Sequence, residues 1–173
     1  MADTFVKIAS VTVGAGGASS IDFTSIPSTY TDLVIKLSAR RSQAYADTYL
    51  RFNNDSGANY SWRQVRGDGS NVSSASGSAQ TYVMSGNGAD RSSYTANTFG
   101  NIEIYVPNYA GSNYKSFSSD SVNENNATQA DAMLVAGLWS STSAINRVTL
   151  YPDIGYGDFV QYSTAVLYGI KNS

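Results

Sequence analysis

The chain has 173 residues, a formal net charge of −2 and no cysteine or histidine. This charge balance argues against nucleic acid or an anionic membrane as the main partner, since both require an excess of Lys and Arg. The two missing residue types exclude disulfides, thiol catalysis, histidine-dependent nucleophilic catalysis and Cys/His zinc sites. Only 14% of the residues are charged while 12% are aromatic, which is typical of an all-β domain with neutral loops.

In chain order, segments of alternating or β-branched residues predict about ten strands and no helix. The predicted strands are residues 5–13, 21–24, 32–40, 45–52, 59–65, 80–84, 99–106, 114–122, 133–140, 145–151 and 159–170. Turn residues separate them at short intervals, as in sandwiches and barrels. The sequence therefore predicts a single domain over residues 1–173, built as a jelly-roll-like β-sandwich of about eight to ten strands.

Three stretches rich in Gly, Ser and Asn predict exposed loops, at residues 67–77, 86–93 and 123–131. If the protein binds glycans, we expect these three loops to carry the site. The last predicted strand is longer than most. Its face with the β-branched and aromatic residues is predicted to be core, and that face comprises Val160, Tyr162, Thr164, Val166, Tyr168 and Ile170.

Phe159 and Leu167 lie on the opposite, mixed face of this last segment. Leaving each of them in water forgoes about 1.5–3 kcal/mol, so we expect a partner to cover that face. The predicted interface residues are Trp139, Phe159, Leu167 and Tyr168. For Trp139, which ends an apolar segment, an ordinary core position is the competing interpretation.

Any enzyme built on this chain would depend on carboxylates, and Glu103 with Asp120 is the pairing that a predicted hairpin suggests for a glycosidase. The simpler expectation is that Glu103 meets a Lys or Arg on a solvated sheet face. The pattern Asn53-x-Asp55-x-Gly57 offers oxygen ligands for Ca²⁺, but is better explained as a turn. We predict no catalytic residue, no metal and no cofactor.

Thirteen tyrosines are divided between predicted strands and loops. The loop residues Tyr109, Tyr114 and Tyr156 are the candidates for stacking on a sugar or anchoring an interface, because tyrosine offers rigid amphipathic area. Tyrosines within strands are expected in the core or in a subunit contact. This even division does not single out a sugar site.

Residues 1–4 lack the basic and apolar segments of a secretion signal, and no apolar run approaches the ~18 residues of a membrane span. The absence of cysteine suits folding in a reducing cytoplasm. We expect a protein made in a cytoplasm, which would need a route such as lytic release to work outside the cell.

Four segments carry a family resemblance: residues 26–40 (IPSTYTDLVIKLSAR), 49–63 (YLRFNNDSGANYSWR), 102–117 (IEIYVPNYAGSNYKSF) and 159–170 (FVQYSTAVLYGI). In this order, over most of the chain, they resemble small virion structural proteins of tailed bacteriophages, a group similar to capsid decoration (cement) proteins, head fibres and tail-fibre domains. The chain lacks the fibre shaft, heptads or collagen-like repeat of a long fibre, which favours a compact decoration protein.

The resemblance implies a β-sandwich that forms a homotrimer on the exterior of the virion. It implies the major capsid protein or another virion protein as partner, and it brings no catalytic residues. A receptor-binding domain of a tail fibre or baseplate, recognising host glycans, is the alternative that it leaves open.

Overall fold

The computed structural model describes residues 4–44, 47–126, 130–153, 155 and 157–171. These residues form thirteen strands and no helix, so none of them builds a helix that could cross a membrane. The strands are β1 (Phe5–Thr12), β2 (Ile21–Phe23), β3 (Asp32–Arg40), β4 (Thr48–Phe52), β5 (Tyr60–Gly67), β6 (Val72–Gln80), β7 (Val83–Gly86), β8 (Ala89–Asp90), β9 (Gly100–Val106), β10 (Lys115–Asn123), β11 (Asp131–Trp139), β12 (Val148–Tyr151) and β13 (Thr164–Ile170).

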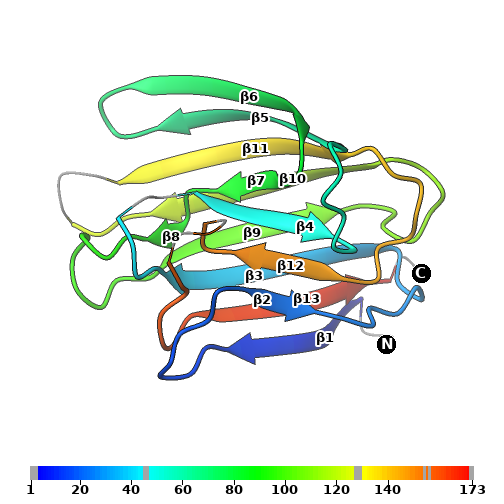
Figure 1. The fold of residues 1–173 in the computed structure, drawn as a ribbon, viewed down its shortest axis with the longest axis horizontal. Helices are drawn as coiled ribbons and strands as arrows, with labels where there is room; N and C mark the ends of the chain where they lie inside the picture. The colour runs from blue at the N-terminus through cyan, green and yellow to red at the C-terminus, as the bar shows by residue number, and fades with distance from the viewer. Residues whose placement is uncertain (1–3, 45–46, 127–129, 154, 156, 172–173) are drawn as a thin grey trace.

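Eight of these strands form a jelly roll of two facing sheets (Figure 1). The larger sheet contains the neighbours β1-β13-β3-β9, and the smaller sheet has the order β2-β12-β4-β7. Numbered one to eight along the chain, these strands follow the orders 1-8-3-6 and 2-7-4-5. This is the arrangement of two Greek keys in a jelly roll. The predicted all-β, jelly-roll-like sandwich is confirmed.

Four further strands extend the larger sheet in the order β10-β11-β5-β6, beyond the edge of the jelly roll. They come from two hairpins, with β5–β6 inserted between β4 and β7 and β10–β11 between β9 and β12. The short β8 pairs with β3 in parallel, whereas all other pairs are antiparallel. In Figure 1, β5 and β6 project past the strands of the smaller sheet.

Part of the loop predicted at residues 67–77 is instead the strand β6. Its run of Ser, Ala and Gly pairs with β5, from Val72 opposite Gly67 to Gly77 opposite Trp62. These residue types have weak intrinsic strand preference, so the backbone pairing decides their structure. The predicted loop at 86–93 differs as well, because Asn87 and Asp90 within it are almost completely buried.

The core lies between the two sheets, where alternate residues of most strands point inward. The pattern is strictest in β9, β10 and β11, whose residues alternate between buried and more accessible positions. Aromatic rings fill the space between β4 and the extension of the larger sheet: the Phe52 ring centroid lies 5.6 Å from that of Phe117 and 5.6 Å from that of Trp139.

The last predicted strand is interrupted, and its faces are the reverse of the prediction. Regular pairing begins at Thr164, Tyr162 has a positive φ of 72°, and Phe159 forms only isolated bridges with Ala18 and Arg41. The fully buried side chains are Phe159, Ser163, Ala165 and Leu167.

The reason for this reversal is the small residue on the inner face of β13. A Cβ on Gly169 would overlap the ring of Tyr30, which packs against the strand at that point. Small residues on the inner face therefore leave space for side chains of other segments. The face is buried although its own residues are not strongly apolar.

Candidate association surface

The larger sheet has an outer face, defined here as the side directed away from the smaller sheet, and no described strand covers it. Of the eight exposed large hydrophobic residues among those described, six lie on this face: Phe5, Val65, Val72, Tyr105, Val122 and Leu134. The other two, Tyr114 and Tyr162, lie in loops. Large exposed apolar patches on a soluble domain mark interaction surfaces.

Four of these residues, Val65, Val72, Val122 and Leu134, form a cluster on the extension, which we name the outer-face patch. Val65 lies opposite Leu134 in the pairing of β5 with β11, and Val122 lies opposite Ala132 in the pairing of β10 with β11. The patch lines a shallow groove with a volume of about 380 Å³. Leu134 is 54% exposed and Val72 81% exposed, so much of their apolar surface is in water.

A second hollow, of about 330 Å³, lies on the same face over β3, β9 and β13. Here the ammonium of Lys36 lies 2.7 Å from Oε2 of Glu103, which confirms the predicted pairing of Glu103 with a cation. The hydrogen bond from Lys36 to Glu103, together with their Coulombic attraction, raises the pKa of Lys36. Asp120 lies directly opposite Glu103 on the neighbouring strand.

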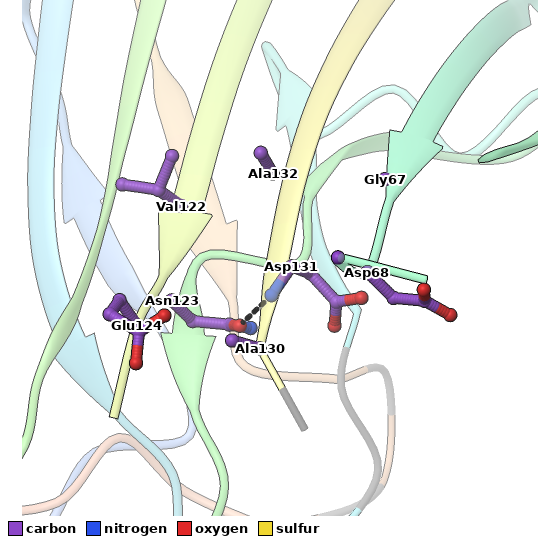
Figure 2. Close-up of a pocket in the computed structure, with 9 residues that line it drawn as sticks. Gly67, Asp68, Val122, Asn123, Glu124, Ala130, Asp131 and Ala132 are labelled. Carbon is purple, nitrogen blue, oxygen red and sulfur yellow. Dashed lines mark hydrogen bonds between the residues drawn. The ribbon is translucent and has the colours of Figure 1, made fainter. Parts of the chain in front are cut away.

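A pocket of about 270 Å³ lies at the end of the extension, as Figure 2 shows. It shares Gly67, Val122 and Ala132 with the groove of the outer-face patch, so the two hollows are adjacent. Two of the three loop regions predicted to bind glycans line this pocket, residues 67–77 through Asp68 and residues 123–131 through Asn123. The third region contributes Asn87, which forms hydrogen bonds with the lining residues Asn123 and Asp131.

Buried hydrogen bonds hold these loop regions together beneath the pocket. The carboxylate of Asp131 accepts a bond of 2.5 Å from Nε of Arg66 and one of 2.8 Å from Nδ2 of Asn87. The backbone N–H of Asp131 donates to Oδ1 of Asn123 at 2.7 Å, the contact drawn in Figure 2. This pairing satisfies a carboxylate that burial would otherwise destabilise, and it explains why regions predicted to be exposed are partly buried.

Two other carboxylates, those of Asp68 and Glu124, line the same pocket. The backbone N–H groups of Asn71 and Ser70 donate to Asp68 and lower its pKa, so this exposed carboxylate stays charged. Glu124 accepts a hydrogen bond from the N–H of Asn126. Among the described residues, no group of three or more acidic side chains could hold a metal ion. The pocket is thus an acidic, open hollow bordered by aliphatic side chains.

The predicted interface residues do not lie together on the surface. Trp139 is 2% exposed, and Phe159 and Leu167 are completely buried inside their own subunit. The prediction that they face a partner was wrong, because the smaller sheet and its loops already cover them. Tyr168 is half-buried on the outer face, with its ring centroid 5.5 Å from that of Phe5.

The loop tyrosines are separated in a similar way. Tyr109 is buried, and its hydroxyl donates a hydrogen bond to the carbonyl of Pro27. Tyr114 is 57% exposed, and Tyr156 lies outside the described residues.

The Asp55 carboxylate accepts hydrogen bonds from the N–H of Gly57 and the amide of Asn59, which confirms the predicted turn.

Sequence reasoning missed the outer-face patch. Leu134 follows Met133 in the run MLVAGLW, where consecutive apolar residues conceal which of them point outward. Val72 lies in a stretch of low complexity, and only its pairing with β5 places it beside Gly67.

Comparison of the chain with known protein families, curated proteins and solved structures found no match.

Proposed function

We propose that this chain is a structural protein of a tailed-bacteriophage virion, and specifically a decoration protein that associates with copies of itself and binds the outer surface of the capsid. The observation that supports this proposal most directly is the uncovered outer face with its apolar patch. The family resemblance in the four strand-turn-strand segments supplies the virion context. The major capsid protein is the proposed partner, and no reaction is involved.

The proposed mechanism is burial of apolar surface. Covering the partly exposed Val65, Val122 and Leu134 contributes about 1 kcal/mol per side chain, at roughly 25 cal/mol per Å². Val65, Val122 and Leu134 lie on paired strands of the larger sheet, so their backbone is ordered before binding, which lowers the entropic cost of association. The ion pair of Lys36 and Glu103 on the same face would fix orientation rather than add much affinity.

The experiment measures binding of purified chain to virus particles that lack it, followed by imaging of the labelled protein on the particles. Many copies over the head support the proposal. Leu134→Asp should weaken binding at least about tenfold, because a buried unpaired carboxylate is costly. Thr24→Asp, which places the same charge on an exposed residue next to β2 of the smaller sheet, should leave binding unchanged. Absence of the protein from particles would refute the proposal.

Recognition of host glycans at a tail tip is a second candidate, supported by the pocket in which the predicted glycan-binding loop regions meet. Its acidic lining of Asp68 and Glu124 suits hydroxyl or amino groups of a sugar. A few labelled copies at the tail, together with glycan binding that Glu124→Gln abolishes and Leu134→Asp does not, would favour this candidate over decoration.

A further inference from the structure

The strand β6 is an unusually exposed edge of the larger sheet. It has nine residues, seven of which are exposed, and its only neighbour in the sheet is β5. An edge strand presents a row of unpaired backbone N–H and C=O groups, which can pair with a strand of another chain. Most strands are about five or six residues long, so β6 offers a long edge.

Soluble proteins usually protect such edges with lysine, proline, bulges or short strands. The opposite edge of the same sheet, β1, carries Lys7 and a register shift between Lys7 and Ala9. The edges of the smaller sheet are short: β2 has three residues, and β7 has four residues that are all buried. Of the sheet edges that the structure describes, β6 is the one that is long and carries no lysine or proline, and its single register shift lies at one end.

The sequence of β6, VSSASGSAQ, contains no charged residue and no proline. Its irregularity is confined to the far end, where the pairing with β5 shifts between Tyr60 and Trp62 and where Ala79 has a φ of 52°. Residues 72–77 therefore form a regular, neutral edge. Such an edge is complementary to itself, because two copies related by a two-fold axis bring no like charges together.

We infer that β6 pairs antiparallel with β6 of a second copy of this chain, so that the two larger sheets become one continuous sheet across a two-fold axis near Ala75. This contact joins two subunits, and it differs from the trimer that the family resemblance implies. It leaves the outer-face patch open, so a pair of subunits presents two patches to a common surface. The inference stands apart from the virion role, since it concerns contacts between copies in solution.

One strand pair is a small interface by the standard of stable complexes, so the expected Kd is about 1–100 µM. Sedimentation equilibrium over that range should show the 18.4 kDa chain converting to a species of twice its mass. Ser74→Lys with Ser76→Lys should weaken this dimer at least about tenfold, because four lysines would meet on one face at the two-fold axis. Both positions are exposed, so folding is preserved.

The matched control is Ser116→Lys with Ser118→Lys, which adds the same charge at exposed positions of β10 on the outer face. This variant should dimerise like the unmodified chain. Hydrogen exchange should also slow in residues 72–78 as protein concentration rises. The inference is overturned by a monomer up to about 500 µM, five times the weakest expected Kd, by a species of three times the chain mass, or by a dimer that the β10 variant disrupts and the β6 variant does not.

Discussion

The indole Nε1 of Trp139 donates a hydrogen bond of 2.7 Å to Oδ2 of Asp55, which joins the end of β11 to the turn between β4 and β5. The Trp139 ring stacks near Tyr60, with centroids 6.4 Å apart and an interplanar angle of 17°. Partial burial alone would raise the pKa of Asp55, but the hydrogen bonds from Trp139, Asn59 and Gly57 outweigh it and lower that pKa. Trp139 is therefore a core residue that also fixes a turn.

Replacing Trp139 should affect stability rather than association. We expect Trp139→Phe to lower the free energy of unfolding by about 1–3 kcal/mol, through a smaller ring and the lost bond to Asp55. Urea denaturation measures this, and Tyr114→Phe at an exposed loop position is the control. An altered subunit assembly at unchanged stability would show instead that Trp139 is an interface residue.

Truncation of two adjacent residues of β13 should destabilise the protein to different extents. Leu167→Ala removes a completely buried side chain and should cost about 2–5 kcal/mol of unfolding free energy. Tyr168→Ala removes a half-buried ring on the outer face and should cost under about 1.5 kcal/mol, mostly its contact with Phe5. Thermal and denaturant melts of both variants test this. The reverse ranking would mean that the outer face of β13 is the core.

Gly137 makes space for an aromatic ring. A Cβ at this position would overlap the ring of Phe117, which packs on Phe52 in the core. We expect Gly137→Ala to destabilise the protein by about 1–3 kcal/mol through overpacking.

A double-mutant cycle identifies this cause. Phe117→Leu on the Gly137→Ala background should cost less than Phe117→Leu alone, because the shorter side chain relieves the overlap. Additive effects of the two substitutions would contradict the overlap as the source of the instability.

Asp22 should make stability depend on pH in the acid range. Burial raises its pKa, but hydrogen bonds from Thr149, Arg147 and Ser20 outweigh burial and hold the pKa below its usual value. A folded-state pKa below the unfolded value of about 3.9 means stability that is present above that pH and lost as pH falls through the folded pKa. Because Asp22 is partly exposed, its contribution is under about 1 kcal/mol.

Unfolding measured from neutral pH down to about pH 2, well below the pKa of an aspartate in an unfolded chain, tests this expectation. Asp22→Asn should be less stable than the unmodified chain at neutral pH, and the difference should shrink as the pH falls. Thr149→Val, which removes one of the hydrogen bonds, should reduce the pH dependence only in part. A stability difference that grows on acidification would contradict the assigned direction.

Local residue patterns were sufficient for the all-β class and the jelly roll. In β9, Ile102 and Ile104 alternate with Glu103, and the structure buries the isoleucines while Glu103 pairs with Lys36. Here the side-chain period of two separates core from solvent within one strand. The Asn53–Gly57 turn followed from residue types that tolerate its backbone, and Asn53 and Asn54 have φ values of 52° and 56°.

Long-range contacts decided the rest. Gly169 belongs to the core face because Tyr30, far away in sequence, occupies the space beside it. Val72 belongs to an exposed strand because β5 supplies its backbone partners. The sequence by itself determined most of the extended segments, since alternation within a segment depends on neighbouring residues, but it did not reveal β6. Only the tertiary structure decided which face of each strand is covered, because coverage depends on the layer that packs against it.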